Sequence, residues 1–147
     1  MNIYIAGRIT QQAQLRAMRQ ALREYDYEVP CSWMDLEAAG YPVEQSRARR
    51  ESWNAILEVK AADVFVLDTT DESPTGGREV ELGIALNDGI RTVRVGPVRN
   101  IFHELCEYVY AEWGDLLLDA DKGVGPFDTE PCDAAHPIFL TQSQAGQ

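Results

Sequence analysis

The chain has 147 residues, 45% of them hydrophobic, and a formal net charge of −11. A length of this size predicts one domain with a substantial core. Nucleic-acid polymers are excluded as partners, since binding to phosphate backbones depends on Lys and Arg. No apolar run approaches the ~20 residues that cross a bilayer, and the N-terminus has no signal-peptide pattern. We therefore expect a cytoplasmic protein that binds no membrane.

Strands and helices alternate along the chain. The predicted strands cover residues 3–6, 27–31, 62–68 and 91–95, and the predicted helices cover about 11–25, 46–61, 78–88 and 100–113. Leu15, Met18 and Leu22 illustrate the helical spacing of apolar residues, whereas Pro30 limits the pairing of the second strand. Alternation of this kind implies parallel strands with right-handed crossovers, and hence an α/β three-layer sandwich.

The C-terminal part of the chain lacks this periodicity. Glycines and prolines interrupt it at Gly123, Gly125, Pro126, Pro131 and Pro137. We therefore expect an α/β domain over residues 1–115. Residues 116–147 are then an extension that is either irregular or packed on a neighbouring subunit.

The most informative stretch joins the strand at 62–68 to the helix at 78–88. The strand ends in Asp68, a Gly76-Gly77 turn follows, and the helix then carries Glu79 and Glu81. Ligand sites in open α/β sheets lie beyond the carboxyl ends of the strands, near backbone amides and positive helix ends. A carboxylate placed there stays ionised at low cost. Glu81 is then either a favourable charge at a helix start or a nucleophile.

Four stretches, in this order and spacing, resemble the nucleoside 2-deoxyribosyltransferase family, which includes nucleoside 5′-monophosphate N-glycosidases. They are Ile3–Gly7, Ala62–Asp68, Thr75–Gly77 and Val80–Gly83. The resemblance spans roughly residues 2–113. It implies a flavodoxin-like parallel sheet of four to five strands. It also implies cleavage of the bond between base and deoxyribose, with transfer to a base or to water and with no cofactor or metal ion.

Glu81 matches the position of the family's nucleophilic glutamate, and Glu79 does not. A carboxylate attacks the anomeric carbon through an oxocarbenium-like transition state and forms a glycosyl ester, as in retaining glycosidases. Glutamate needs no partner to deprotonate it at neutral pH. The competing interpretation is that acids are simply favoured in first helical turns.

One position departs from the family pattern. The family usually carries an aspartate on the preceding helix, where it handles the proton of the leaving base, but the alignment places Asn54 or Ala55 there. Asn54 can form hydrogen bonds but cannot act as a general acid. Glu51, Glu58 and Asp68 are candidate replacements. The alternative function is a catalytically impaired nucleotide-binding or regulatory protein that uses the same pocket.

The loop before Glu81 bears on the substrate. Family members that act on monophosphates carry a hydroxyl residue in this loop, and Thr75 resembles them. Thr75 with the amides of Gly76 and Gly77, and with Arg8 or Arg78, is expected to bind a 5′-phosphate. Thr75 serves equally well as a plain helix cap. The sequence therefore leaves the nucleoside and its monophosphate open as substrates.

The remaining candidates border the same site. Gly7 and Arg8 follow the first strand, and the rings of Tyr4 or Trp33 are candidates to stack on the base, although aromatic residues are more often core. His103 and His136 are the only histidines, which leaves little for a metal site or a Ser-His-Asp triad. Since the family usually builds its sites from more than one subunit, we expect a dimer or larger homo-oligomer.

Overall fold

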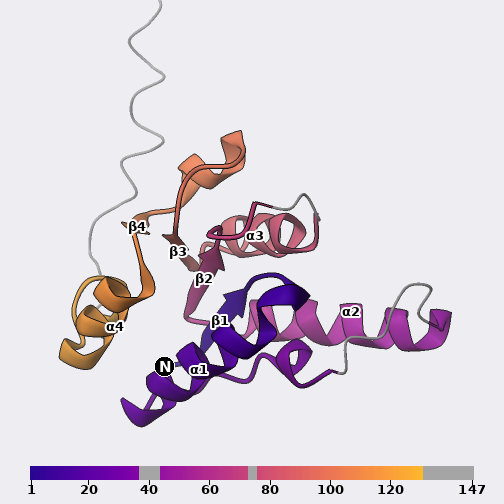
Figure 1. Cartoon of the computed structure of the whole chain (residues 1–147), viewed down its shortest axis with the longest axis horizontal. Coiled ribbons are helices and arrows are strands. Elements are labelled where there is room, and N and C mark those ends of the chain that lie inside the picture. The colour runs from indigo at the N-terminus through magenta and orange to yellow at the C-terminus, as the bar shows by residue number, and fades with distance from the viewer. Residues whose placement is uncertain (37–43, 73–75, 131–147) are drawn as a thin grey trace, which may run out of the picture.

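A parallel four-stranded sheet forms the middle layer of the protein (Figure 1). The computed structural model describes residues 1–36, 44–72 and 76–130. The strands lie side by side in sequence order, β1-β2-β3-β4. Their bounds are Ile3–Ala6 (β1), Val64–Asp68 (β2), Arg91–Val95 (β3) and Tyr108–Tyr110 (β4). Parallel pairing brings the carboxyl ends of all four strands to one edge.

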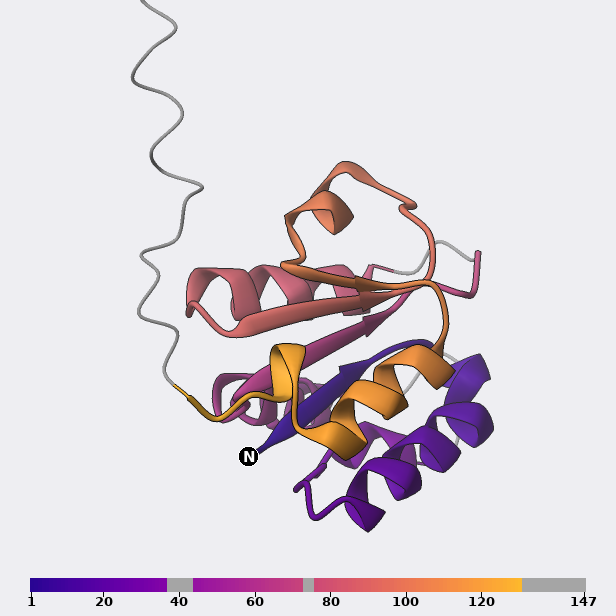
Figure 2. The same ribbon diagram turned by 90° about the vertical axis from the view of Figure 1, so that its left-hand side faces the viewer.

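Two pairs of helices cover the faces of this sheet. Helix α1 (Gln12–Glu24) packs against α4 (Trp113–Lys122), and α2 (Gln45–Lys60) packs against α3 (Gly77–Asn87). Figures 1 and 2 show the sheet between these two pairs. All residues of β1 and β2 are buried, because helices exclude water from both of their faces. The α/β sandwich predicted from the sequence is confirmed.

The predicted strand at 27–31 forms only in part. A single bridge joins Glu28 to Asn2, beside β1. Beyond this bridge Pro30 has no N–H to donate, and Cys31 turns out of the extended conformation with φ of 34°. The amide of Ile5 donates instead to the Cys31 sulfur, at 3.1 Å. The segment occupies the place of a fifth strand without completing its ladder.

The predicted helix at 100–113 is wrong. Its place is taken by a short 3₁₀ turn, Ile101–Leu105, followed by strand β4. The apolar residues that suggested a helix gain no buried face here, since Ile101 is 78% exposed and Val109 is 56% exposed. The β-branched and aromatic residues at 108–110 pair with β3 instead, as their side chains favour.

Helix α4 crosses residue 115, where the sequence analysis placed the end of the domain. Leu116 and Ala120 are buried, and the hydroxyl of Tyr27 donates to the Ala120 carbonyl at 2.7 Å. Phe127 is buried against the same layer and contacts the ring of Tyr27. The α/β unit therefore continues beyond residue 115 at least to Phe127. Within the described part of the chain, no helix has the length and apolarity needed to cross a membrane.

Candidate active site

Glu81 lies one turn into helix α3, facing strand β1. The hydroxyl of Tyr4 donates a hydrogen bond to its Oε1 at 2.9 Å. The sequence places these two residues 77 positions apart, and the fold joins them because α3 packs on the sheet face that carries the Tyr4 side chain. The contact orients one of the two carboxylate oxygens of Glu81.

Tyr4 is held in place by the core. It is fully buried, and its ring stacks on Phe65 with centroids 5.9 Å apart and planes 9° from parallel. Burial, reinforced by the Glu81 carboxylate, raises the pKa of Tyr4 far above its usual value, so the phenol remains a donor. The prediction that Tyr4 stacks on a substrate base finds no support in this geometry, since its ring is already stacked on Phe65.

The protonation of Glu81 differs from the expectation based on the helix dipole. Burial raises the pKa of Glu81 to about 7, against 4.5 for a free glutamate. The hydrogen bond from Tyr4 acts in the opposite direction, and the carboxylates of Glu58 and Glu79 raise the pKa further. The first helical turn favours an anion, but desolvation outweighs this effect. Glu81 therefore titrates near neutral pH.

Asp68 points to the opposite face of the sheet. Strand side chains alternate, so Phe65 and Asp68 face different layers. The Asp68 carboxylate is fully buried and accepts from the indole N–H of Trp113 at 2.7 Å and from the Thr70 amide and hydroxyl at 2.8 and 2.6 Å. Gln11 donates to it at 3.3 Å. The structure does not bring Asp68 together with Glu81.

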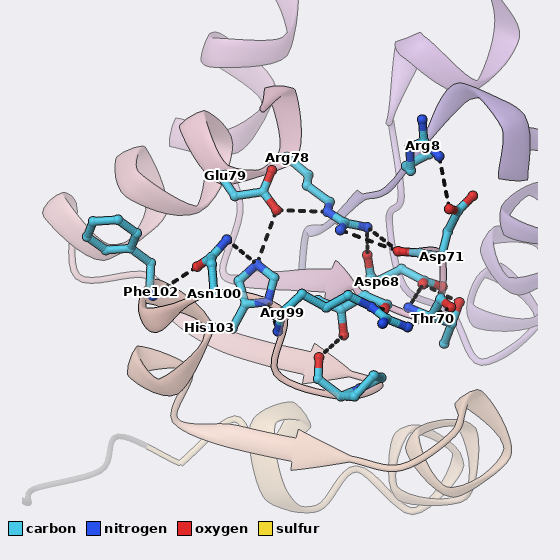
Figure 3. A network of polar contacts seen from close by, with 12 residues as sticks. Arg8, Asp68, Thr70, Asp71, Arg78, Glu79, Arg99, Asn100, Phe102 and His103 are labelled. Atoms are coloured by element: carbon cyan, nitrogen blue, oxygen red, sulfur yellow. Dashed lines mark hydrogen bonds and ion pairs between the residues drawn. The ribbon is translucent and has the colours of Figure 1, made fainter. Parts of the chain in front are cut away.

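The two arginines proposed to bind phosphate are engaged within the protein (Figure 3). The Arg78 side chain is 4% exposed and contacts Glu79 at 2.9 Å. It also donates to the carbonyls of Asp68 and Asp71, at 3.0 and 3.4 Å. Arg8 forms an ion pair with Asp71 at 2.9 Å. Both arginines hold the loop that follows β2.

The glycines of the site have different roles. A Cβ on Gly7 would lie 2.3 Å from a Leu15 methyl carbon, so glycine allows α1 to pack closely on the end of β1. Gly76 and Gly77 are exposed and a Cβ there would meet nothing within 4 Å. Thr75 lies outside the described residues.

Two other residues predicted to belong to the site, Trp33 and Asn54, take no part in the hydrogen bond between Tyr4 and Glu81. The Trp33 indole N–H donates to the Ile5 carbonyl at 2.9 Å, which fixes the ring beside the end of β1. Asn54 is exposed on α2, next to Trp53, which is 59% exposed. The structure gives no contact between Asn54 and Glu81.

A buried histidine, His103, anchors Glu79 (Figure 3). The backbone N–H of Arg99 donates to His103 Nδ1 at 3.2 Å, and Nε2 lies 3.1 Å from Glu79 Oε1 and 3.0 Å from the amide nitrogen of Asn100. Burial lowers the pKa of His103 and keeps it neutral. Sequence patterns do not reveal this contact, because 24 residues separate the two side chains. The contact of Trp113 with Asp68 is equally hidden, since no motif connects these two residues.

Groups of His, Cys, Asp or Glu suited to a metal ion are absent from residues 1–36, 44–72 and 76–130. The titratable groups that interact with Glu81 among the described residues are Tyr4, Cys31, Glu58 and Glu79. Such a site can do carboxylate chemistry: covalent attack, or proton transfer, on a ligand at the start of α3.

Comparison with known proteins gives structural relatives only. No protein-family model matches the chain, and no curated protein matches it significantly. The 2-deoxyribosyltransferase of the psychrotolerant bacterium Bacillus psychrosaccharolyticus is similar, with TM-score 0.66 and 18% identity, over 80% of this chain and 90% of that one. The Clostridium botulinum CMP N-glycosidase BcmB gives TM-score 0.53 and 14% identity, over 83% and 99%.

A conserved protein from Enterococcus faecalis V583 is also similar, with TM-score 0.60 and 18% identity, over 84% of this chain and 99% of that protein. These likenesses show a shared flavodoxin-like fold. Two of the three relatives are named for the chemistry that the sequence motifs around Glu81 suggested independently.

The Tyr4–Glu81 hydrogen bond gives a direct prediction. Tyr4→Phe keeps the stacked ring and removes the donor, so the pKa of Glu81 should rise above about 7. A hydrogen bond to a charged group is worth ~1.5–3 kcal/mol, so a rise of about one to two units is expected. Carboxyl ¹³C NMR titration measures it. Tyr27→Phe, which removes the distant bond to Ala120, is the control, and an unchanged or lower pKa in Tyr4→Phe would refute the assignment.

Proposed function

We propose that this protein is an enzyme that cleaves the N-glycosidic bond of 2′-deoxynucleosides or their 5′-monophosphates. The observation that carries the proposal is the Glu81 carboxylate, held by the buried Tyr4 hydroxyl at 2.9 Å at the ligand-binding edge of a flavodoxin-like sheet. The motifs around Glu81 and the structural relatives named as a deoxyribosyltransferase and a CMP N-glycosidase support it.

In the proposed reaction, ionised Glu81 attacks the anomeric carbon as the bond to the base breaks. The bonding electrons leave with the base, and a deoxyribosyl ester of Glu81 remains. A second base or a water molecule then attacks the anomeric carbon, the bond to the Glu81 oxygen breaks and restores the carboxylate, and the proton of the attacking molecule balances the one taken up by the departed base. The Tyr4 hydroxyl stabilises the negative charge on Glu81 before attack and again when the ester is released.

Replacement of the nucleophile tests this role. Glu81→Gln should retain the fold and ligand binding but lower base release by at least ~10³-fold, because an amide cannot form the ester. The measurement is chromatographic detection of free base from a panel of nucleosides and nucleotides. Glu79→Gln is the matched control, two residues away in the same helix.

Equal activity in Glu81→Gln and the wild type would end the assignment to Glu81. Loss of activity in Glu79→Gln alone would transfer it to Glu79. Binding of nucleotides by a wild-type protein that releases no base would favour the alternative function, a nucleotide-binding or regulatory protein.

The protein contacts of Arg8 and Arg78 affect whether the site prefers a 5′-phosphate or a free 5′-hydroxyl on the substrate. Arg8 is paired with Asp71, and Arg78 is buried against Glu79 and two carbonyls, so a phosphate would compete with these partners. The net charge of −11 also repels anions. We therefore expect 2′-deoxynucleosides to bind at least as tightly as their monophosphates. Calorimetry with matched pairs measures this, and a tenfold preference for monophosphates would instead support a phosphate site at Thr75, Gly76 and Gly77.

The proposed enzyme is also expected to self-associate. Trp53 and Leu57, one turn apart on α2, are 59% and 62% exposed and lie on the helix that carries Asn54 and Glu58. We propose that a second copy of the chain covers this face. Light scattering at micromolar concentration should show a dimer or larger, and Leu57→Glu should shift it toward monomer. Leu118→Glu, at an exposed position on α4, is the control, and a fully active wild-type monomer would disprove the proposal.

A further inference from the structure

Strand β4 exposes an apolar side chain on the α2–α3 face of the sheet. Val109 is the register partner of Arg94, so its side chain lies on the face where Arg94 donates to the His103 carbonyl at 3.1 Å. Helix α4, which packs on β4, lies on the opposite face, where the Tyr110 hydroxyl donates to Asp119 at 2.7 Å. Val109 is more than half exposed.

The 3₁₀ turn before β4 extends this apolar surface. Side chains three residues apart lie on the same side of a 3₁₀ turn, and Phe102 and Leu105 are 57% and 46% exposed. Figure 3 shows the Phe102 ring turned away from the His103 network. We call Phe102, Leu105 and Val109 the β4 surface. Single exposed apolar residues are common, but three of them within eight positions form a candidate docking surface.

The outer edge of β4 also carries backbone groups directed away from the sheet. Among the described residues, β4 is the last strand on its side. The Gly96 amide donates to the Tyr110 carbonyl at 2.9 Å. Backbone groups alternate in direction along a strand, so the amide and carbonyl of Val109 point away from β3. An edge that combines such groups with apolar side chains is one that proteins usually cover.

A stretch near the end of the chain has the composition of a strand. Residues 131–147 lie outside the described residues, and among them Ile138, Phe139 and Leu140 are consecutive apolar residues, followed by Thr141. β-Branched and aromatic residues of this kind favour strands. Residues 134–147 contain no Asp, Glu, Lys or Arg. The stretch therefore adds no charge beside the acidic residues next to the β4 surface.

The described chain ends where this stretch is within reach of β4. Arg91, the first residue of β3, donates to the carbonyls of Pro126 and Asp128, so the chain continues from the amino end of β3. Strand β4 lies about 5 Å beyond β3, and roughly ten residues from Asp128 to Ile138 span up to ~33 Å. A chain that enters from this end runs parallel to β4, like the other strand pairs of the sheet.

We propose that residues 138–141 lie along the free edge of β4 as an added parallel strand of the same chain. The amide and carbonyl of Val109 pair with the backbone of this segment, and its apolar side chains cover the β4 surface. The tether favours this occupant over a second copy, because a short linker keeps the segment at a high effective concentration beside the edge. The inference does not depend on the proposed catalysis.

Amide hydrogen exchange in the full-length chain, followed by NMR, tests this docking at Val109. The variant Ile138→Ser/Phe139→Ser/Leu140→Ser removes the apolar side chains whatever their register. Its Val109 amide should exchange at least ~10-fold faster than that of the wild type, because an unpaired edge amide is open to solvent. Gln142→Ser/Gln144→Ser, in the same part of the chain, is the matched control and should exchange as the wild type does.

The Tyr110 amide, which points toward β3, is the internal reference and should keep its exchange rate in every variant. Equal exchange at Val109 in the wild type and the triple variant would overturn the proposal. An equal acceleration at Tyr110 would also count against it, since the substitutions would then loosen the whole sheet. Protection of Val109 that disappears on dilution would assign the edge to a second copy and refute docking within one chain.

Discussion

The hydrogen bond between Tyr4 and Glu81 is the contact on which the proposed chemistry depends. It joins strand β1, at the edge of the sheet, to helix α3 at 2.9 Å, and its donor is held in place because the Tyr4 ring is buried and stacked on Phe65. The same burial that fixes the donor removes water from the carboxylate. A preorganised donor in a poorly solvated site stabilises a charge more effectively than water does.

Within the described part of the chain, a polar network lies on each face of the sheet. On the α1–α4 face, Asp68 receives hydrogen bonds from Gln11, Thr70 and Trp113 and so connects three segments to the end of β2. On the α2–α3 face, Arg78, Glu79 and His103 join the loop after β2 to the turn after β3. Buried networks of hydrogen bonds and ion pairs rigidify a fold. Glu81 belongs to neither network, and the hydrogen bond that holds it comes from the Tyr4 hydroxyl.

Much of this arrangement is predictable from the sequence, and the rest depends on distant contacts. Strands β1 and β2 are recognisable because both of their faces are buried and their residues are almost all apolar. The motif at 80–83 predicts Glu81 as the candidate nucleophile. Local patterns cannot show that Asp68 faces the other layer or that Arg78 is buried, since both depend on register and on partners far along the chain. The helix predicted at 100–113 was wrong because apolar spacing alone does not show whether a face becomes buried.

The central claim is that Glu81 forms a covalent bond with the sugar. Rapid acid quenching of the wild-type enzyme during turnover of a 2′-deoxynucleoside, followed by proteolysis and mass spectrometry, tests it most directly. The account predicts a deoxyribosyl group on the peptide that contains Glu81, assigned to that residue by fragmentation and absent from Glu81→Gln. A deoxyribosyl group on Glu79 or Glu58 instead, with Glu81 unmodified, would contradict it.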